Sequence, residues 1–355
     1  MSALSAPWLL DGAHGEGGGG LLHTVLALSA LTQQPVRIQG VRGASSMPGL
    51  SAEDLTLLRP LALCCEAKVE GAELRSPEIT FSPSSRPRSL NELIDVYQPS
   101  EGSGEGFANA LLVSNALLPV LARAGAFSSV VVRGETHGHR ILSFDYFANA
   151  TVVALRRFGL YAFPEIVSAG FGRGSAGEIK LEVEPSALSG VDWSERGELR
   201  CCRAIVVTAQ VGETVGDRGV SHLERLAHNA DVPIQTEWVE VPSKGSGAFA
   251  TVWAEFERGM GGATAMGRRG VRIEAVAQQA FEGFQSWLRS GATVDQHLAD
   301  QILLAAAIAE GETEFTVDRL TQRFLTMAWA IKQLLPIRLV VRGQEGVFGE
   351  VHIRR

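Results

Sequence analysis

One order of predicted helices and strands occurs three times in this chain, and that repetition constrains the fold more than any other feature. Each unit reads helix, strand, helix, strand, strand, because apolar residues at helical spacing alternate with short runs rich in β-branched residues. The leading helices are expected to begin at residues 21, 106 and 295. About 85 residues separate the first two starts and about 189 the last two, which indicates an insertion before the third unit.

The boundaries of the units follow from prolines, glycines and changes of hydrophobic period. In chain order, the predicted elements are helix 21–32, strand 36–39, helix 51–66 and strands 68–73 and 78–83; helix 106–124, strand 129–133, helix 144–158 and strands 160–167 and 178–184; and helix 295–309, strand 313–317, helix 320–334 and strands 337–342 and 347–353.

The residues between the second and third units have a pattern of their own. They are predicted to form strand 203–211, helix 219–231, strand 233–241, strand 250–257 and an amphipathic helix 271–289. We therefore predict an α/β fold of three repeated α-β-α-β-β units around a pseudo-threefold axis, built from residues 1–186 and 292–355, with a small α/β domain inserted at 187–291. The glycine-rich stretch 257–271 is expected to be a mobile loop.

Composition excludes several classes of protein. A hydrophobic content of 45% with 20% charged residues argues against bulk disorder. The formal net charge of −7 means that a nucleic-acid partner needs a local basic patch. No apolar run reaches the length of a membrane span, and the first residues do not resemble a signal peptide. The cysteines form two adjacent pairs rather than a disulfide framework, so we expect a cytoplasmic protein with reduced thiols and no membrane partner.

A glycine run, DGAHGEGGGG at residues 11–20, precedes the first helix. Glycine lets a ligand approach the backbone, and the helix start supplies free N–H groups and a positive dipole end, so Gly17, Gly18 and Gly19 are candidates for holding phosphates. Glu16 would repel a bare phosphate, which suggests a bridging metal ion. A structural turn is the alternative reading.

The repeat, the insertion and three motifs together resemble the RNA 3'-terminal phosphate cyclase family. DGAHGEGGGG is similar to the family's N-terminal signature, and HLADQ at 297–301 is similar to its ATP-binding segment. The turn Met47-Pro48-Gly49-Leu50 stands where the family has a similar Pro-Gly-Leu. The resemblance extends over nearly the whole chain in the same order.

The resemblance implies an ATP-dependent reaction at RNA 3' ends. In the family, a histidine on the last long helix attacks the α-phosphorus of ATP to give a covalent histidine–AMP. AMP passes to the RNA 3'-phosphate, and the neighbouring 2'-hydroxyl then closes a 2',3'-cyclic phosphate. A divalent cation, Mg²⁺ or Mn²⁺, neutralises charge on the triphosphate.

The chain departs from the family at the nucleophile. After Phe315-Thr316-Val317 come five intervening residues, and Arg323 then stands where the family has its histidine. A guanidinium stays protonated and cannot attack phosphorus, but it can bind phosphate or carboxylate in two-pronged fashion. A salt bridge to an acid is the alternative role. His14 and His297 are weak candidates for replacing the missing histidine, since HLADQ occurs in the family together with the catalytic histidine.

The remaining site residues are carried over by position. The resemblance assigns Glu16 to the metal, and Arg42 together with His23, which replaces an arginine of the family, to the RNA substrate. It assigns the nucleotide to Gly17, Gly18, Gly19, Asn115 (a glutamine in the family), His297, Leu298, Ala299, Asp300 and Gln301. For residues 297–301 a solvated helix start is the alternative.

Three functions follow. The first is an ATP-dependent RNA 3'-phosphate cyclase. The second is a catalytically inactive paralogue that binds RNA with a 3'-terminal phosphate, or another RNA end, in RNA processing or assembly. The third is a different nucleotide-dependent reaction in the same cleft without a covalent nucleotide. Whether the chain forms a homo-oligomer is left open.

Overall fold

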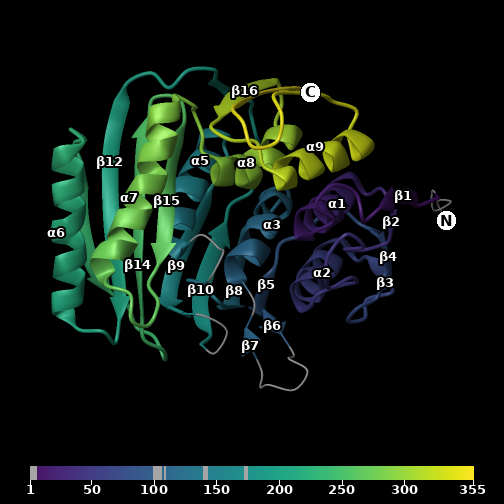
Figure 1. Cartoon of the computed structure of the whole chain (residues 1–355). Coiled ribbons are helices and arrows are strands. Elements are labelled where there is room, and N and C mark those ends of the chain that lie inside the picture. Colours follow the sequence, from purple (N-terminus) through teal and green to yellow (C-terminus); the bar gives the residue numbers. More distant parts are fainter. Residues whose placement is uncertain (1–5, 99–105, 108, 139–142, 172–174) are drawn as a thin grey trace.

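Three four-stranded sheets with the same strand order form most of the molecule. The computed structural model describes residues 6–98, 106–107, 109–138, 143–171 and 175–355 (Figure 1). The sheet orders are β1-β2-β4-β3, β5-β8-β10-β9 and β11-β16-β18-β17. In each sheet the first two strands are parallel and the other neighbours are antiparallel. The strands are β1 Trp8–Asp11, β2 Val36–Gln39, β3 Lys68–Glu70, β4 Glu78–Ser82, β5 Asn91–Asp95, β8 Ser128–Gly134, β9 Ala162–Ser168, β10 Gly177–Val183, β11 Asp192–Trp193, β16 Glu312–Val317, β17 Arg338–Arg342 and β18 Gly349–Arg354.

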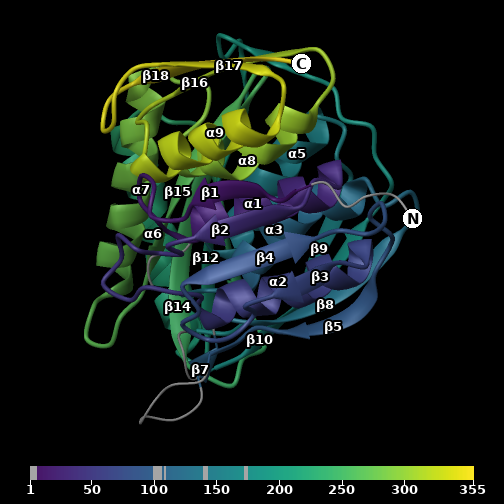
Figure 2. The ribbon, with the colours of Figure 1, turned by 90° about the vertical axis from the view of Figure 1, so that its right-hand side faces the viewer.

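The helices that follow these strands pack between the sheets in one shared core. Leu26, Leu117, Leu303 and Phe324, from four of the helices, are all fully buried in it. The helices are α1 Gly19–Thr32, α2 Ala52–Cys65, α3 Ala110–Ala122, α4 Phe144–Tyr146, the π-helix η1 Phe147–Thr151, α5 Val152–Arg157, α8 Gln296–Ile308 and α9 Gln322–Leu334. Figure 2 shows α1 and α2 behind the first sheet, with α8 and α9 above them.

A fourth sheet, in the order β13-β12-β14-β15, lies on the side of the molecule opposite the N-terminal unit (Figure 1). Helices α6 and α7 cover one of its faces and enclose a separate apolar cluster. A second cluster, which includes Phe171 and Phe249, joins the other face to the middle unit. The elements are β12 Leu199–Ala209, α6 Glu213–Asn229, β13 Gln235–Glu240, β14 Gly247–Phe256, β15 Met260–Met266 and α7 Ile273–Ser290, with a separate ribbon of β6 Tyr97–Gln98 and β7 Gly106–Phe107.

The prediction of an α/β fold is confirmed, the sheets are found to be mixed, and several predicted elements are corrected. Each sheet has a leading strand, β1, β5 or β11, that the sequence pattern did not predict. Helix 144–158 is interrupted by the π-turn η1. The pseudo-threefold axis and the domain boundaries stay predictions.

The prediction of a mobile loop at 257–271 is wrong, because Met260–Met266 form strand β15, which pairs with β14. Its glycines serve close packing. A Cβ on Gly261 would lie 2.5 Å from the Trp287 ring, and one on Gly262 would lie 2.4 Å from the carbonyl oxygen of Val252. The composition of this stretch therefore reflects α7 lying against the strand rather than flexibility.

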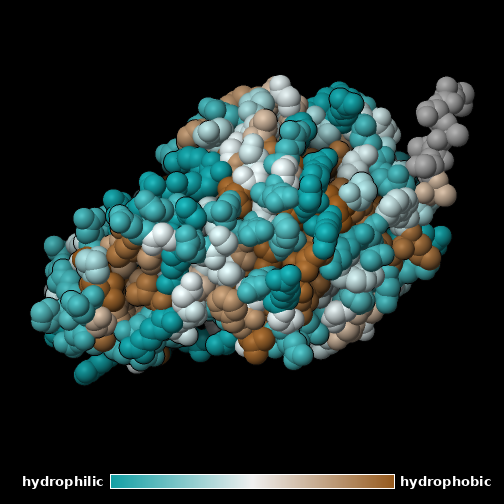
Figure 3. Space-filling model, turned by 90° about the horizontal axis from the view of Figure 1, so that it is seen from above, coloured by the Kyte–Doolittle hydropathy of each residue, from teal (hydrophilic) through white to brown (hydrophobic). Residues whose placement is uncertain are grey.

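The surface carries the polar residues that the composition leads one to expect. On the face shown in Figure 3, hydrophilic residues dominate and apolar residues are exposed in smaller groups between them. Among the described residues, no helix is long and apolar enough to cross a membrane.

The side chain of Asp295 makes hydrogen bonds to three elements, α8, β15 and α4. Its Oδ1 caps α8 by accepting from the backbone N–H of His297 at 2.8 Å and of Leu298 at 3.1 Å. Its Oδ2 accepts from the backbone N–H of Gly262 at 2.9 Å and from the Tyr146 hydroxyl. The carboxylate therefore links α8 to β15 and α4.

We expect Asp295→Ala to lower the free energy of unfolding by about 2–4 kcal/mol, because a cap is lost and two buried donors are left unpaired. Urea unfolding followed by circular dichroism measures this. Asp217→Ala, at an exposed position of α6, is the matched control and should change stability by less than about 0.5 kcal/mol. Equal stability of the two variants would contradict the linking role of Asp295.

Candidate functional site

The first turns of four helices meet at one cavity of about 240 Å³. These helices are α1, α3, α8 and α9, which come from all three sheet units. Side chains of Asn109, Asp295 and Thr321 cap α3, α8 and α9, whereas α1 has no side-chain cap. The free N–H groups at the start of α1 and the positive dipole ends of the helices favour an anion here. The main lining residues are Gly20, His23, Asn109, Asn115, Phe147, His297, Asp300, Gln301 and Arg323.

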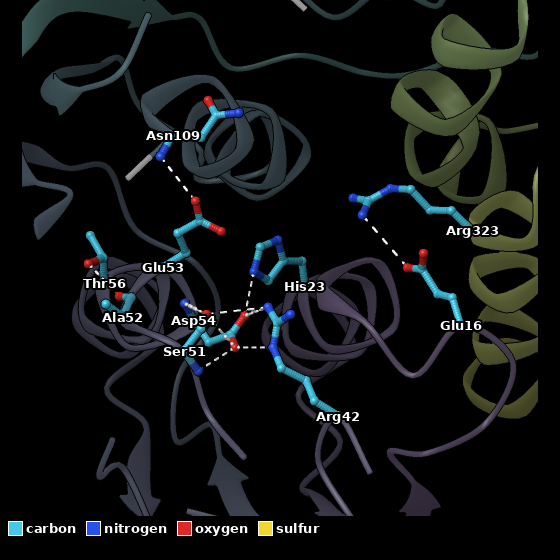
Figure 4. Close-up of polar contacts among 10 residues, drawn as sticks. All are labelled: Glu16, His23, Arg42, Ser51, Ala52, Glu53, Asp54, Thr56, Asn109 and Arg323. Atoms are coloured by element: carbon cyan, nitrogen blue, oxygen red, sulfur yellow. Dashed lines mark hydrogen bonds and ion pairs between the residues drawn. The ribbon is translucent and has the colours of Figure 1, made fainter. Parts of the chain in front are cut away.

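The carboxylate of Asp54, in the first turn of α2, holds one wall of this cavity (Figure 4). Its Oδ1 lies 3.0 Å from His23 Nε2 and accepts from Arg42 Nη2 at 3.0 Å, while Oδ2 accepts from Arg42 Nε at 2.9 Å. The backbone N–H and hydroxyl of Ser51 both donate to Oδ2 at 2.8 Å. Burial raises the pKa of Asp54, but the hydrogen bonds from His23 and Arg42 outweigh it and hold the pKa well below its usual range.

Arg42 adopts a left-handed backbone conformation, with φ of 52°. A non-glycine residue pays on the order of 1 kcal/mol for such a conformation. The forked contact with Asp54 offsets that cost and fixes the guanidinium next to the glycine run, where a Cβ on Gly19 would lie 3.1 Å from Nη2. The position of Arg42 is thus set by Asp54 rather than by free rotation in solvent.

The opposite wall contains a second cation between two acids. Arg323 Nη1 lies 3.7 Å from Glu16 Oε1, and Arg323 Nε lies 3.8 Å from Asp300 Oδ2. Thr326, one turn along α9, accepts a hydrogen bond from the backbone N–H of Glu16 at 3.0 Å and so fixes the glycine run against this helix. Residue 323 and the glycine run, 300 positions apart in the chain, therefore lie side by side (Figure 4).

Asp300 is the acid whose environment is most perturbed. Burial raises its pKa to about 7, although the Arg323 charge and a hydrogen bond from Thr321 Oγ1 at 3.0 Å act in the opposite sense. A carboxyl group poised near neutrality at a cavity wall is typical of functional sites.

The segment 297–301, at the start of α8, divides into two faces. His297, Asp300 and Gln301 line the cavity, and Gln301 is held by the Thr151 hydroxyl from the π-turn η1. Leu298 and Ala299 point the other way and are fully buried in the main core, so the structure does not place them among the lining residues.

The other predicted residues take distinct places. Asn115 lines the cavity with a buried Oδ1 that no donor reaches among the described residues. Gly19 faces His23 and Arg42, and Gly18 lies against Glu16, whereas a Cβ on Gly17 would meet Ala13 and Ala44 instead. His14 stacks on Trp329 with ring centroids 3.8 Å apart and is absent from the cavity lining.

Comparison with known proteins identifies the family of this chain. A family model described as RNA 3'-terminal phosphate cyclase matches residues 14–341. The chain belongs to the RNA 3'-terminal phosphate cyclase family. It is 34% identical to a protein of that name from Methylococcus capsulatus, over 97% of this chain and 95% of the relative. Relatives of the same name from Nostoc punctiforme and Archaeoglobus fulgidus are 33% and 34% identical, over 91% and 92% of this chain and 93% and 95% of the relatives.

Three residues around this cavity escaped the sequence analysis. Asp54 and Thr326 position residues that face the cavity. Asn109 lines the cavity itself, caps α3 and donates its backbone N–H to Glu53 at 3.1 Å. Of these three residues, only Asp54 could have been noticed in the sequence, because its spacing from Ser51 matches a helix capping box. The contact of Asp54 with His23 requires the tertiary structure.

The raised pKa of Asp300 gives a pH test. Between the unfolded value and about 7, the folded chain binds more protons than the unfolded chain at this site, so this group's contribution to stability falls as pH rises. We expect Asp300→Asn to gain stability relative to the parent protein by at least about 1 kcal/mol between roughly pH 5 and pH 8. Denaturant unfolding across that range measures the difference. A constant difference would mean that Asp300 is ionised throughout.

Proposed function

We propose that this chain binds ATP and the 3'-terminal phosphate of an RNA in the cavity between α1, α3, α8 and α9, and converts the RNA 3'-phosphate to a 2',3'-cyclic phosphate. The observation that carries the proposal is the meeting of four helix N-termini, the glycine run and the Arg323 guanidinium at one cavity. Such a site favours phosphates locally even though the chain as a whole has a net charge of −7.

Each wall has a role in the proposal. The face of α8 with His297, Asp300 and Gln301, together with Asn115, holds the nucleotide. Gly18 and Gly19 bring backbone N–H groups to its phosphates. His23 and Arg42, on the Asp54 side, lie where the RNA end meets the phosphates of the nucleotide. Arg323 binds a phosphate oxygen and does not itself form a bond to phosphorus, since its guanidinium has no free electron pair.

A divalent cation, Mg²⁺ or Mn²⁺, fits beside Glu16. Among the described residues, no hydrogen-bond donor reaches the buried Oε1 of Glu16, and no set of three metal-ligating side chains is grouped. Magnesium usually takes one or two carboxylates and completes its shell with water and substrate phosphates, so a single glutamate suits it. The ion would supply charge neutralisation at the phosphates.

The architecture is part of the same proposal. The equivalent strand orders of the three sheets support three repeated units around a pseudo-threefold axis, residues 1–186 and 292–355. The separate apolar cluster under α6 and α7 supports a small domain within 187–291. The pairing of β11 with β16 ties residues 192–193 to the C-terminal unit.

Arg323 also favours a second candidate, a paralogue that binds RNA ends without reaction. The two differ in what happens to the RNA. An RNA ending in a 3'-phosphate is incubated with ATP and Mg²⁺ and then treated with a phosphomonoesterase, which cannot remove a cyclic phosphodiester. Phosphatase-resistant ends that form only with ATP are the expected result. Tight binding of the same RNA without such ends would favour the second candidate, and neither binding nor product would contradict both.

The role of Arg323 can be measured by nucleotide binding alone. Arg323→Ala removes charge-assisted hydrogen bonds to phosphate and leaves Glu16 and Asp300 without their cation, so we expect ATP affinity to fall by about ten- to a hundred-fold. Isothermal titration calorimetry gives the affinities. Arg289→Ala, at an exposed position of α7, is the matched control and should bind as the parent protein does. Unchanged affinity in Arg323→Ala would contradict a phosphate-binding role.

A further inference from the structure

We propose that His23, held by Asp54, is the nucleophile of this cavity and takes the adenylyl group of ATP on Nδ1. The inference rests on the proposed function, because it needs ATP to bind here. His23 lines the same cavity as Arg323, and its ring lies between the Asp54–Arg42 pair and the Arg323–Glu16 pair (Figure 4).

The side chains of His23 and Arg323 lie beside two adjacent glycines, Gly19 and Gly20. A Cβ on Gly19 would lie 3.5 Å from His23 Cε1, and a Cβ on Gly20 would lie 3.0 Å from Arg323 Cγ. Phosphates held by the backbone N–H groups at this helix start therefore have an imidazole on one side and a guanidinium on the other. The pair provides a nucleophile and a cation on opposite sides of one anion site.

Asp54 decides which nitrogen of His23 can react. Its oxygens receive hydrogen bonds from Arg42 and Ser51, and an ionised carboxylate can only accept, so the Nε2 that lies 3.0 Å from Oδ1 must carry the ring proton. In the neutral ring, Nδ1 then keeps its electron pair. Figure 4 shows Nδ1 on the side of the ring away from Asp54, and among the described residues no hydrogen bond involves it.

The step balances without a further reagent. The electron pair of Nδ1 forms a bond to the α-phosphorus while the bond from that phosphorus to the bridging oxygen breaks, and pyrophosphate leaves with its electron pair. The ring, which keeps its proton on Nε2, becomes a positively charged N-phosphoryl imidazole, and the Asp54 carboxylate at 3.0 Å stabilises that charge. An RNA phosphate oxygen later attacks the same phosphorus, and the imidazole leaves neutral.

The proposal gives the two substituted positions complementary roles. The family resemblance places an arginine at position 23 and a histidine at position 323, and this chain has the two residue types the other way round. Both positions line one cavity, so the exchange keeps one imidazole and one guanidinium beside the phosphates.

The test is covalent labelling with ATP that carries the label in its α-phosphate, in the presence of Mg²⁺. The full chain is denatured in alkali, because a phosphoramidate is labile in acid, and the labelled peptide is mapped by mass spectrometry. We expect the label on His23. His23→Gln should lose labelling by on the order of a hundred-fold or more, while its affinity for ATP stays within about threefold. His228→Gln, at an exposed position of α6, is the matched control and should label normally.

A double variant keeps the proposal testable even if His23→Gln does not fold. In His23→Arg with Arg323→His, the imidazole moves to the other side of the glycine run, and we expect the label to move with it to residue 323. A purely structural role for His23 would not relocate a covalent adduct.

Each outcome is decisive. ATP binding without any adduct, or an adduct on His14 or His297, would overturn the role of His23 and leave the proposed nucleotide site standing. Failure of the parent protein to bind ATP would overturn the nucleotide site and the nucleophile together.

Discussion

The buried carboxylate of Asp54 is the contact on which the cavity depends. It begins α2 through the capping box with Ser51, holds Arg42 in a left-handed conformation and orients the ring of His23. Three segments of the N-terminal unit therefore converge on one anion. Because two cationic or proton-donating side chains face it, the carboxylate stays ionised despite its burial, and the polar wall of the cavity keeps one geometry.

The other wall of the cavity is formed by helices that are distant from the N-terminal segment in the sequence. Helices α3, α8 and α9 start at the same cavity as α1, although they belong to different units of the chain. Thr326 fixes the glycine run against α9, and this contact brings Arg323 next to Glu16. The proposed phosphate site thus depends on how these helices are placed relative to one another, and a change in the packing between them would alter it without changing a site residue.

The sequence was sufficient for the α/β class and for most helices. Asn115, Asp300 and Arg323 line one cavity, with Glu16 beside Arg323, while their roles stay predictions. The sequence pattern was misleading where tertiary contacts determine the environment of a residue. The glycines at 261–262 resembled a loop but serve close packing, and Leu298 and Ala299 share a motif with contact residues but lie on the buried face of α8. The partner of His23 is 31 residues away, and no periodicity reveals such a pair.

The most direct measurement is a structure of this chain with a bound ATP analogue whose α,β bridge cannot be cleaved. The account predicts triphosphate oxygens on the N–H groups of Gly18 and Gly19, the Arg323 guanidinium on a phosphate oxygen, and His23 Nδ1 facing the α-phosphorus opposite the leaving pyrophosphate. A triphosphate bound outside this cavity, or His23 with its Nδ1 turned toward Asp54, would contradict it.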